Sequence, residues 1–199
     1  MSRVQIKTSN GIMWLTAPID RKKSGKLINE VFFSSTEDWR EKHLKTIRRA
    51  YSRAPHFEEM FETVQEIYSF QTDHLSDFNI NAIQVISQWL GLTPQFGYAS
   101  RNEIGGSSTQ RLVDLCKSTG CDNYVTGLGA LKYLDHEKFE KKNVSVCYMD
   151  YQKKVYMQQH GEFTPYVSII DAIANCGPQV RDLVCSQSIY WRDYVDKQK

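Results

Sequence analysis

The sequence lacks the features that would place the protein in a membrane or outside the cell. No apolar run approaches the roughly 20 residues that a bilayer span requires. Residues 1–10 are polar and have no apolar core of a signal peptide. No stretch is rich enough in glycine, serine or proline to separate independent domains. We therefore expect one soluble, cytoplasmic domain over residues 1–199, with no membrane partner.

Cysteine is scarce and poorly spaced for metal or disulfide chemistry. The five cysteines form no C-x-x-C pair and no two histidines stand four residues apart, so we expect neither a metal site nor a cofactor. Free thiols are expected instead. For Cys116, a buried structural role is favoured over a catalytic one because it lies among apolar positions of a predicted helix. The missing G-x-S-x-G motif excludes the usual hydrolase nucleophile elbow.

An excess of either charge is also lacking. The 25 basic and 23 acidic residues leave a formal net charge of +2, so we expect no nucleic-acid partner. Hydrophobic residues make up 41% of the chain, which excludes disorder as its main state. A local anion site is compatible with this balance.

The hydrophobic pattern predicts an α/β fold. Strands are expected at 14–19, 27–33, 95–100, 124–126 and 144–148. Three helices are expected between Ser35 or Thr36 and Gly91, the last two as an antiparallel hairpin. Further helices are expected near Ser108, between 130 and 142, at Val167 and after Gln179. Alternation after residue 95 is typical of βαβ crossovers, so we expect a mostly parallel sheet flanked by helices, with a helical insert at 36–91.

Two glycine-containing turns follow predicted strands, so both should lie at the carboxyl edge of the sheet, where ligands bind. In the first, the sequence GGSSTQR (105–111) leads into a helix. The hydroxyls of Ser108 and Thr109 and the charge of Arg111 could hold an anion there. An ordinary Ser/Thr helix cap explains the same residues and is favoured on the residues alone.

The second turn contains Thr126, Gly127 and Gly129. It follows a strand and precedes a helix, as a phosphate-cradling turn does, but it lacks both complete glycine-rich phosphate motifs. A tight turn that uses glycine for positive φ is the alternative. A shared position of the two turns would favour one composite anion site.

A polar and aromatic segment at 156–163 precedes the predicted helix at Val167. His160 and Glu162 could act as an acid–base pair, joined by Asp171 if the fold returns it to them. Alternatively, Thr164 and Pro165 simply start the helix and Glu162 is a surface charge. The two interpretations are about equal.

Several stretches, in order along the chain, carry a resemblance to a known family. They are WLTAPI (14–19), INEV (28–31), STQRLV (108–113) with Leu115 and Cys116, YVTGLGALKYLD (124–135), and residues 159–178, which include FTPYVSIID (163–171) and NCG (175–177). The sequence thereby resembles the WbqC-like family of bacterial proteins, often linked with O-antigen and other surface-glycan biosynthesis.

Members of this family usually begin with a QPxFFPxxGY motif, an acidic strand and a W-x-N-R segment. This sequence begins with the segment just after those. From the resemblance we expect the first strand–helix unit of the domain to be missing, which would leave a sheet edge for a partner to cover.

The resemblance implies a transferase that moves an acyl or aminoacyl group to a nucleotide-linked amino sugar. The expected ligand is a nucleotide-sugar or another anionic small molecule. The alternative is a non-catalytic binding or assembly protein of a glycan-biosynthesis complex, with a protein partner or a homo-oligomer.

Overall fold

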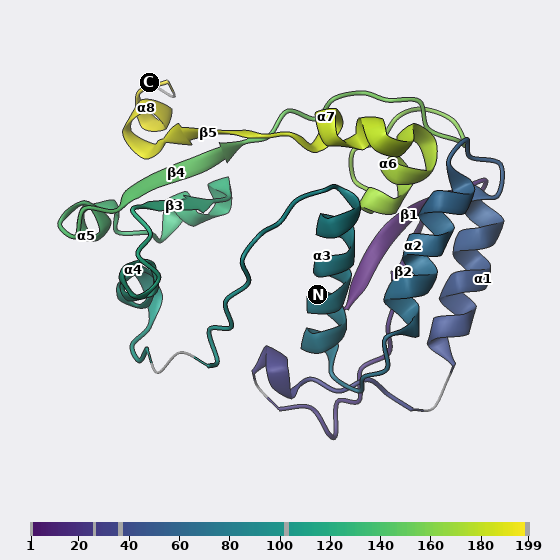
Figure 1. Ribbon diagram of the computed structural model, residues 1–199, viewed down its shortest axis with the longest axis horizontal. Coiled ribbons are helices and arrows are strands. Elements are labelled where there is room, and N and C mark those ends of the chain that lie inside the picture. Colours follow the sequence, from purple (N-terminus) through teal and green to yellow (C-terminus); the bar gives the residue numbers. More distant parts are fainter. Residues whose placement is uncertain (1, 26, 36–37, 102–103, 198–199) are drawn as a thin grey trace. The chain divides into compact units, whose positions relative to one another are not determined.

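The computed structural model describes residues 2–25, 27–35, 38–101 and 104–197, which divide into two compact units (Figure 1). The first unit comprises Met1–Pro94 and Lys153–Leu183, and the second comprises Gln95–Gln152 and Val184–Lys199. A single domain with a helical insert at 36–91 stays a prediction. Thr36, one of the two expected helix caps, lies outside the described residues. No helix in the described ranges is long and apolar enough to cross a membrane.

The first unit joins an antiparallel hairpin to a set of helices. β1 (Arg3–Thr8) pairs with β2 (Gly11–Thr16), with Arg3 opposite Thr16. α1 packs on β1, and α2 packs against α1, α3 and α6. The helical elements are η1 (Ile28–Glu30), α1 (Trp39–Tyr51), α2 (Phe57–Ser69), α3 (Leu75–Trp89), α6 (Ile169–Cys176), η3 (Gly177–Gln179) and α7 (Val180–Val184).

The three helices from Trp39 to Trp89 confirm the predicted helical stretch. Their apolar stripes enclose one core, made of Ala17, Phe33, Trp39, Ile67, Leu75 and Phe78. α1 begins after Asp38, whose Oδ1 accepts a hydrogen bond from Glu41 N at 3.1 Å. The helix predicted at Val167 is α6, which ends before Gly177.

Two observations explain why the residue after α6, Gly177, is a glycine. Its φ of +54° lies in the left-handed region. In addition, a Cβ at this position would lie 2.4 Å from Nδ1 of His56. His56 N also donates to Ala174 O at 2.9 Å, so α6 and the start of α2 approach as closely as only glycine permits.

Two strand predictions for the first unit need correction. β2 covers Gly11–Thr16, so it starts and ends earlier than the predicted strand at 14–19. The strand predicted at 27–33 is wrong: η1 forms there, followed by single bridges at Phe32 and Phe33. The polar residues Asn29 and Glu30 interrupt the apolar pattern of this segment. Glu30 Oε2 accepts a hydrogen bond from Leu27 N, and this bond closes a turn where the strand was expected.

The second unit is a small mixed sheet with helices. Its sheet has the order β3–β4–β5, with β3 (Asn123–Thr126) parallel to β4 (Ser145–Asp150) and β5 (Gln187–Tyr190) antiparallel to β4. The helical elements are α4 (Ser108–Ser118), η2 (Leu128–Lys132), α5 (His136–Glu140) and α8 (Trp191–Asp196). Buried side chains of α4, η2, α5 and β4 form its core, with Phe139, Val146 and Tyr148 completely enclosed.

The prediction of a mixed helix-and-strand protein is confirmed. The prediction of a mostly parallel sheet is wrong, because the described strands form two small sheets, one antiparallel and one mixed. One parallel βαβ unit forms between β3 and β4, as the alternation predicted. The segment at 95–100 forms no strand, and most of it is exposed. β4 pairs on its other side with β5, which comes from the distant C-terminal stretch and therefore runs antiparallel without a crossover.

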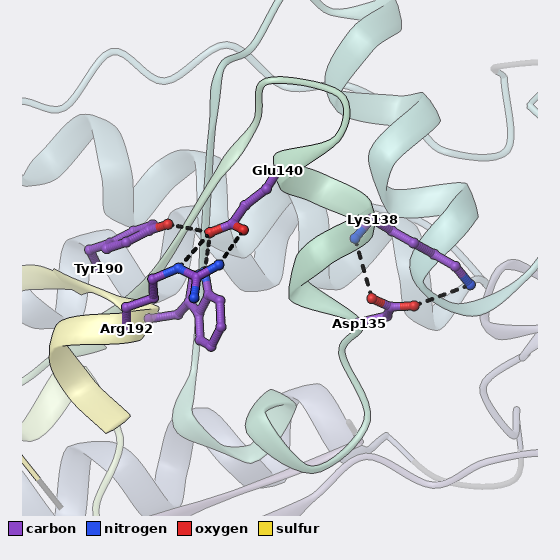
Figure 2. Close-up of polar contacts among 6 residues, drawn as sticks. Asp135, Lys138, Glu140, Tyr190 and Arg192 are labelled. Carbon is purple, nitrogen blue, oxygen red and sulfur yellow. Dashed lines mark hydrogen bonds and ion pairs between the residues drawn. The ribbon is translucent and has the colours of Figure 1, made fainter. Parts of the chain in front are cut away.

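Glu140 fastens the C-terminal stretch to the second unit (Figure 2). Its Oε1 accepts from Tyr190 Oη, from Trp191 Nε1 at 3.0 Å and from Arg192 Nε at 3.1 Å. Its Oε2 accepts from Arg192 Nη2 at 2.6 Å. Trp191 also stacks on His136 at 4.3 Å between ring centroids. One carboxylate thus links the end of α5 to both β5 and α8.

We expect Glu140→Gln to destabilise the second unit at neutral pH, because a neutral amide accepts weaker hydrogen bonds than a carboxylate. Hydrogen bonds from Arg192 and Tyr190 lower the pKa of Glu140 to about 2. Stability that comes from a lowered folded-state pKa is complete above the unfolded-state pKa and is lost as pH falls through the folded-state value. The difference in urea stability between wild type and Glu140→Gln should therefore shrink between about pH 5 and pH 2. Glu137→Gln, on an exposed position of the same helix, is the control, and a pH-independent difference would contradict the assignment.

Candidate functional site

A buried carboxylate lies at the centre of the first unit. Asp171, in the first turn of α6, is completely buried. Its Oδ2 accepts from Tyr51 Oη at 3.0 Å, and its Oδ1 accepts from Tyr156 Oη at 2.8 Å. Asn175 Nδ2 donates to the backbone oxygen of Asp171 at 2.7 Å and lies 3.4 Å from Oδ1. These donors and the start of the helix stabilise a negative charge in an interior position.

A buried lysine lies in the same network. Lys7 on β1 is only 4% exposed, and its Nζ donates to Gln158 Oε1 and Gly161 O, both at 3.1 Å, and to Glu162 O. Its backbone N–H donates to Tyr51 Oη at 3.1 Å. Tyr51 therefore connects the strand that carries the cation to the helix that carries the anion.

Gln158 organises the segment that Lys7 holds. Its Nε2 donates to Tyr156 Oη at 3.0 Å and to Thr164 O at 2.9 Å, while its Oε1 accepts from Thr164 N at 2.9 Å. His160 has a φ of +65°, and its Nε2 lies 3.0 Å from Ala50 O. Because a carbonyl oxygen only accepts, this ring nitrogen must carry a proton. The segment at 156–164 is thus fixed to β1, α1 and α6.

Burial controls the protonation of the groups around Asp171. Burial and the negative charge of Asp171 raise the pKa values of Tyr51 and Tyr156 far above the ordinary tyrosine range. Both hydroxyls therefore stay protonated and donate hydrogen bonds to the carboxylate of Asp171. Burial, with Asp171 as a second cause, also raises the pKa of the Cys176 thiol, which disfavours the nucleophilic thiolate.

An open cleft of about 630 Å³ borders this network. Its lining comprises Val155, Tyr156, Met157, Asn175, Cys176, Gln179, Asp182 and Leu183. Tyr156 and Asn175 both line the cleft and both reach Asp171. The carboxylate therefore lies behind these two residues of the cleft wall.

The three residues predicted for acid–base chemistry, His160, Glu162 and Asp171, all lie in the first unit, but they make different hydrogen bonds. Asp171 is connected to Glu162 through Tyr51 and Lys7, but Glu162 contributes its backbone oxygen, and its side chain is exposed. His160 is exposed and bonds to Ala50 O. Tyr156 and Gln158 lie inside the segment selected from the sequence.

Lys7 and Tyr51 were not predicted as site residues. A lysine inside the pattern of a strand was the available signal for Lys7, since a strand lysine that faces inward requires acceptors. Tyr51 gave no such signal, because a tyrosine at the end of an apolar helical stripe is ordinary.

The residues predicted for phosphate binding lie in the second unit. Ser108 begins α4, but Thr109 is buried and its Oγ1 accepts from Asp135 N at 3.1 Å. Arg111 Nη2 donates to Ala99 O at 3.3 Å. In the part of the chain that the structure describes, no hydrogen bond joins these residues to the second turn.

Thr126 ends β3, and the exposed Gly127 and Gly129 follow it. Gly127 has a φ of −81°, so the tight turn with positive φ considered for this position does not form. A Cβ at either glycine would meet no atom within 4 Å. Neither glycine is therefore required by the backbone or by packing among the described residues.

Among the described residues, no group of three His, Cys, Asp or Glu side chains is arranged to hold a metal ion. All five cysteines are free thiols, and Cys116 is buried in the core of the second unit, as predicted.

The fold and this site define a mixed α/β protein with a cleft of mixed polar and apolar lining, backed by a buried carboxylate. The chain belongs to the WbqC-like protein family, whose profile matches residues 1–182. It is similar to the uncharacterized protein Rv1507c of Mycobacterium tuberculosis, with 32% identity over 184 residues, which cover 91% of this chain and 79% of that protein. No solved structure matches the chain significantly.

We expect Tyr51→Phe to lower the free energy of unfolding of the first unit by about 1–3 kcal/mol, because it leaves a buried carboxylate oxygen and Lys7 N without a partner. Tyr166→Phe is the matched control, since that hydroxyl is exposed and contacts only Lys153 among the described residues. Urea denaturation of both variants tests this expectation. Equal losses in the two variants would show that the buried hydroxyl contributes nothing special.

Proposed function

We propose that this chain is a transferase that moves an acyl or aminoacyl group to the amino group of a nucleotide-linked amino sugar in bacterial surface-polysaccharide (O-antigen) biosynthesis. Membership of the WbqC-like family supports the glycan setting. The observation that carries the chemistry is Tyr156, which lines the cleft and whose hydroxyl donates to the buried carboxylate of Asp171.

The lining of the cleft favours an amine over a phosphate. Among the described residues that line it, none is basic and Asp182 is acidic. Tyr156, Asn175 and Gln179 add neutral hydrogen-bonding groups, while Val155, Met157 and Leu183 offer apolar contact for carbon atoms of a sugar ring. An amino group gains attraction from the Asp182 carboxylate, whereas the described lining residues offer a phosphate no cation, and Lys154 Nζ beside the cleft already donates to Asp182 O at 2.6 Å.

The bound ammonium first loses one proton to solvent, and the neutral amine then loses a second proton as it is acylated. As the amine nitrogen forms its bond to the acyl carbon, the bond from that carbon to the leaving group of the donor breaks and the amine loses a proton. Tyr156 Oη accepts this proton while it passes its own to Asp171 Oδ1, which it contacts at 2.8 Å. Tyr51 and Asn175 hold the carboxylate in position for this transfer. Asp171 therefore acts through Tyr156 and does not touch the substrate.

The other residues selected from the sequence enter the proposal with smaller parts. His160 and Glu162, on the segment fixed by Lys7, are proposed for acid–base steps at the leaving group. Ser108, Arg111, Thr126, Gly127 and Gly129 are proposed contacts for phosphate. Thr109 is proposed to contact phosphate through its backbone, because its side-chain oxygen already accepts a hydrogen bond from Asp135 N.

The test is a thermal-shift titration with UDP- and dTDP-linked amino sugars and with the N-acetylated form of each. Ligand at 100 times its Kd stabilises a protein by about 2.7 kcal/mol, so binding at millimolar Kd or tighter raises Tm. We expect the free amines to raise Tm more than the N-acetylated sugars, and Tyr156→Phe to abolish acyl transfer to the amine. Tyr166→Phe should transfer normally. Absence of stabilisation by every amine-bearing sugar would overturn the proposal.

An assembly protein without catalytic activity is the second candidate, favoured by one observation. Val155, Met157 and Tyr166 are 75%, 86% and 65% exposed on one stretch of the first unit, which is unusual for large apolar side chains. A stoichiometric protein partner that is lost with Tyr166→Glu, at a position that does not line the cleft, together with unchanged glycan in cells that carry Tyr156→Phe, would favour this candidate over the transferase.

A further inference from the structure

A second pocket of the first unit lies where the tip of the β1–β2 hairpin meets α1. Its volume is about 250 Å³, and its lining comprises Thr8, Ser9, Asn10, Met13, Thr46, Arg49 and Ala50. None of these residues belongs to the residues selected from the sequence. The pocket is polar on the hairpin side and carries a cation on the helix side.

Arg49 is the charged side chain of this pocket. No acidic residue lines the pocket in the described ranges. On the same helix, Lys45 pairs with Glu41 at 2.6 Å, and Arg48 lies over the Phe61 ring at 4.4 Å. Arg49 has no ion pair or stacking partner in the part of the chain that the structure describes. Its guanidinium is therefore available for an anion in a way that its neighbours are not.

Neutral donors surround this cation. The hydroxyls of Thr8 and Thr46 are engaged, since they donate to Gly11 O and Lys42 O, both at 2.8 Å. The side chains of Ser9 and Asn10, at the exposed hairpin tip, have no hydrogen-bond partner among the described residues. Together with Arg49 they supply an amide, a hydroxyl and a guanidinium, which is a typical donor set for phosphate oxygens.

The end of α1 would normally oppose an anion, because the last carbonyl groups of a helix are electronegative. Ala50 O, at the wall of the pocket, is occupied by the Nε2–H of His160. This contact neutralises one of the carbonyls nearest to Arg49. It also connects the pocket to the segment that reaches the cleft at Tyr156.

We propose that this pocket is a second phosphoryl site, separate from the phosphate contacts proposed in the second unit, with Arg49 as its principal contact. That its ligand is the nucleotide which carries the amino sugar rests on the proposed transferase function, whereas the anion site rests on the pocket alone. The Asp182-bordered cleft has no cation for phosphate, and Arg49 supplies one in the same unit. The segment from Tyr156 to His160 contacts both sites, since Tyr156 lines the cleft and His160 Nε2 bonds to the backbone oxygen of Ala50, a residue of the pocket.

Isothermal titration with pyrophosphate and with UDP tests this site, using wild type and the variants Arg49→Gln, Arg53→Gln and Arg111→Gln. Arg53 is an exposed arginine just beyond α1 and controls for general charge; Arg111 controls for the phosphate site proposed in the second unit. We expect Arg49→Gln to weaken both ligands about tenfold or more, as loss of a charge-assisted contact does. Arg53→Gln should remain within about twofold of wild type. Arg111→Gln measures how much of the binding belongs to the phosphate contacts proposed in the second unit. Circular dichroism and an unchanged Tm without ligand confirm that Arg49→Gln folds.

Three outcomes overturn the site: wild type binds neither ligand, Arg49→Gln binds like wild type, or Arg53→Gln weakens binding equally. A loss confined to Arg111→Gln is the second of these and moves the phosphate to the second unit. Neither pyrophosphate nor UDP carries an amino sugar, so these results do not depend on transfer. If pyrophosphate and UDP bind in an Arg49-dependent way but no amino sugar binds, the anion site holds and the transferase is refuted. If acyl transfer occurs and does not depend on Arg49, the transferase holds and the anion site is refuted.

Discussion

The first unit depends on two opposite charges that are buried in one hydrogen-bonded network. Asp171 and Lys7 each pay a desolvation cost that only well-placed partners offset. The partners of Asp171 are hydroxyls and an amide, and those of Lys7 are oxygens of residues 158–162. Because Tyr51 contacts both ends, the strand β1, the helices α1 and α6 and the segment at 156–164 have one mutual arrangement. The proposed cleft inherits its wall from this arrangement.

The same network explains why Tyr156, and not Asp171, is the residue proposed to exchange a proton with the substrate. A carboxylate that is wholly enclosed keeps its position but loses access to a ligand. In the proposed mechanism the hydroxyl of Tyr156 relays the proton to this carboxylate without exposing the charge. The raised pKa of the tyrosine keeps the proton on its oxygen before the transfer. The donors to Asp171 are already in place, so the proposed transfer requires no rearrangement of them.

Sequence reasoning succeeded where the relevant contacts are local. The apolar stripes of α1, α2 and α3 repeat every three or four residues, and a stop at Gly177 follows from local backbone geometry. It failed for the sheet of the second unit, because β5 pairs with β4 from across the chain and the segment at 95–100 finds no partner. An alternating pattern cannot reveal which strand will lie beside it.

The candidate site shows the same division. The segment at 156–163 and Asp171 stand out as polar groups close together in the sequence. Lys7 and Tyr51 join them across separations of 154 and 120 residues, which no local pattern encodes. Likewise, the hydroxyl of Thr109 looked free in the sequence, yet a backbone N–H 26 residues away occupies it.

Each unit closes only when a late stretch of chain returns to an early one. Lys7 and Tyr51 leave the ribosome well over a hundred residues before Asp171, and α5 emerges long before Arg192. During synthesis Lys7 has none of its acceptors from residues 158–162, so its strand has no reason to remain buried. The first unit can therefore finish folding only after residues 153–183 are synthesised, and the second only after residues 184–196, so the two units do not fold one after the other as contiguous domains do. A chaperone that holds the early hairpin and helices would have a defined task, ending when residues 153–183 arrive.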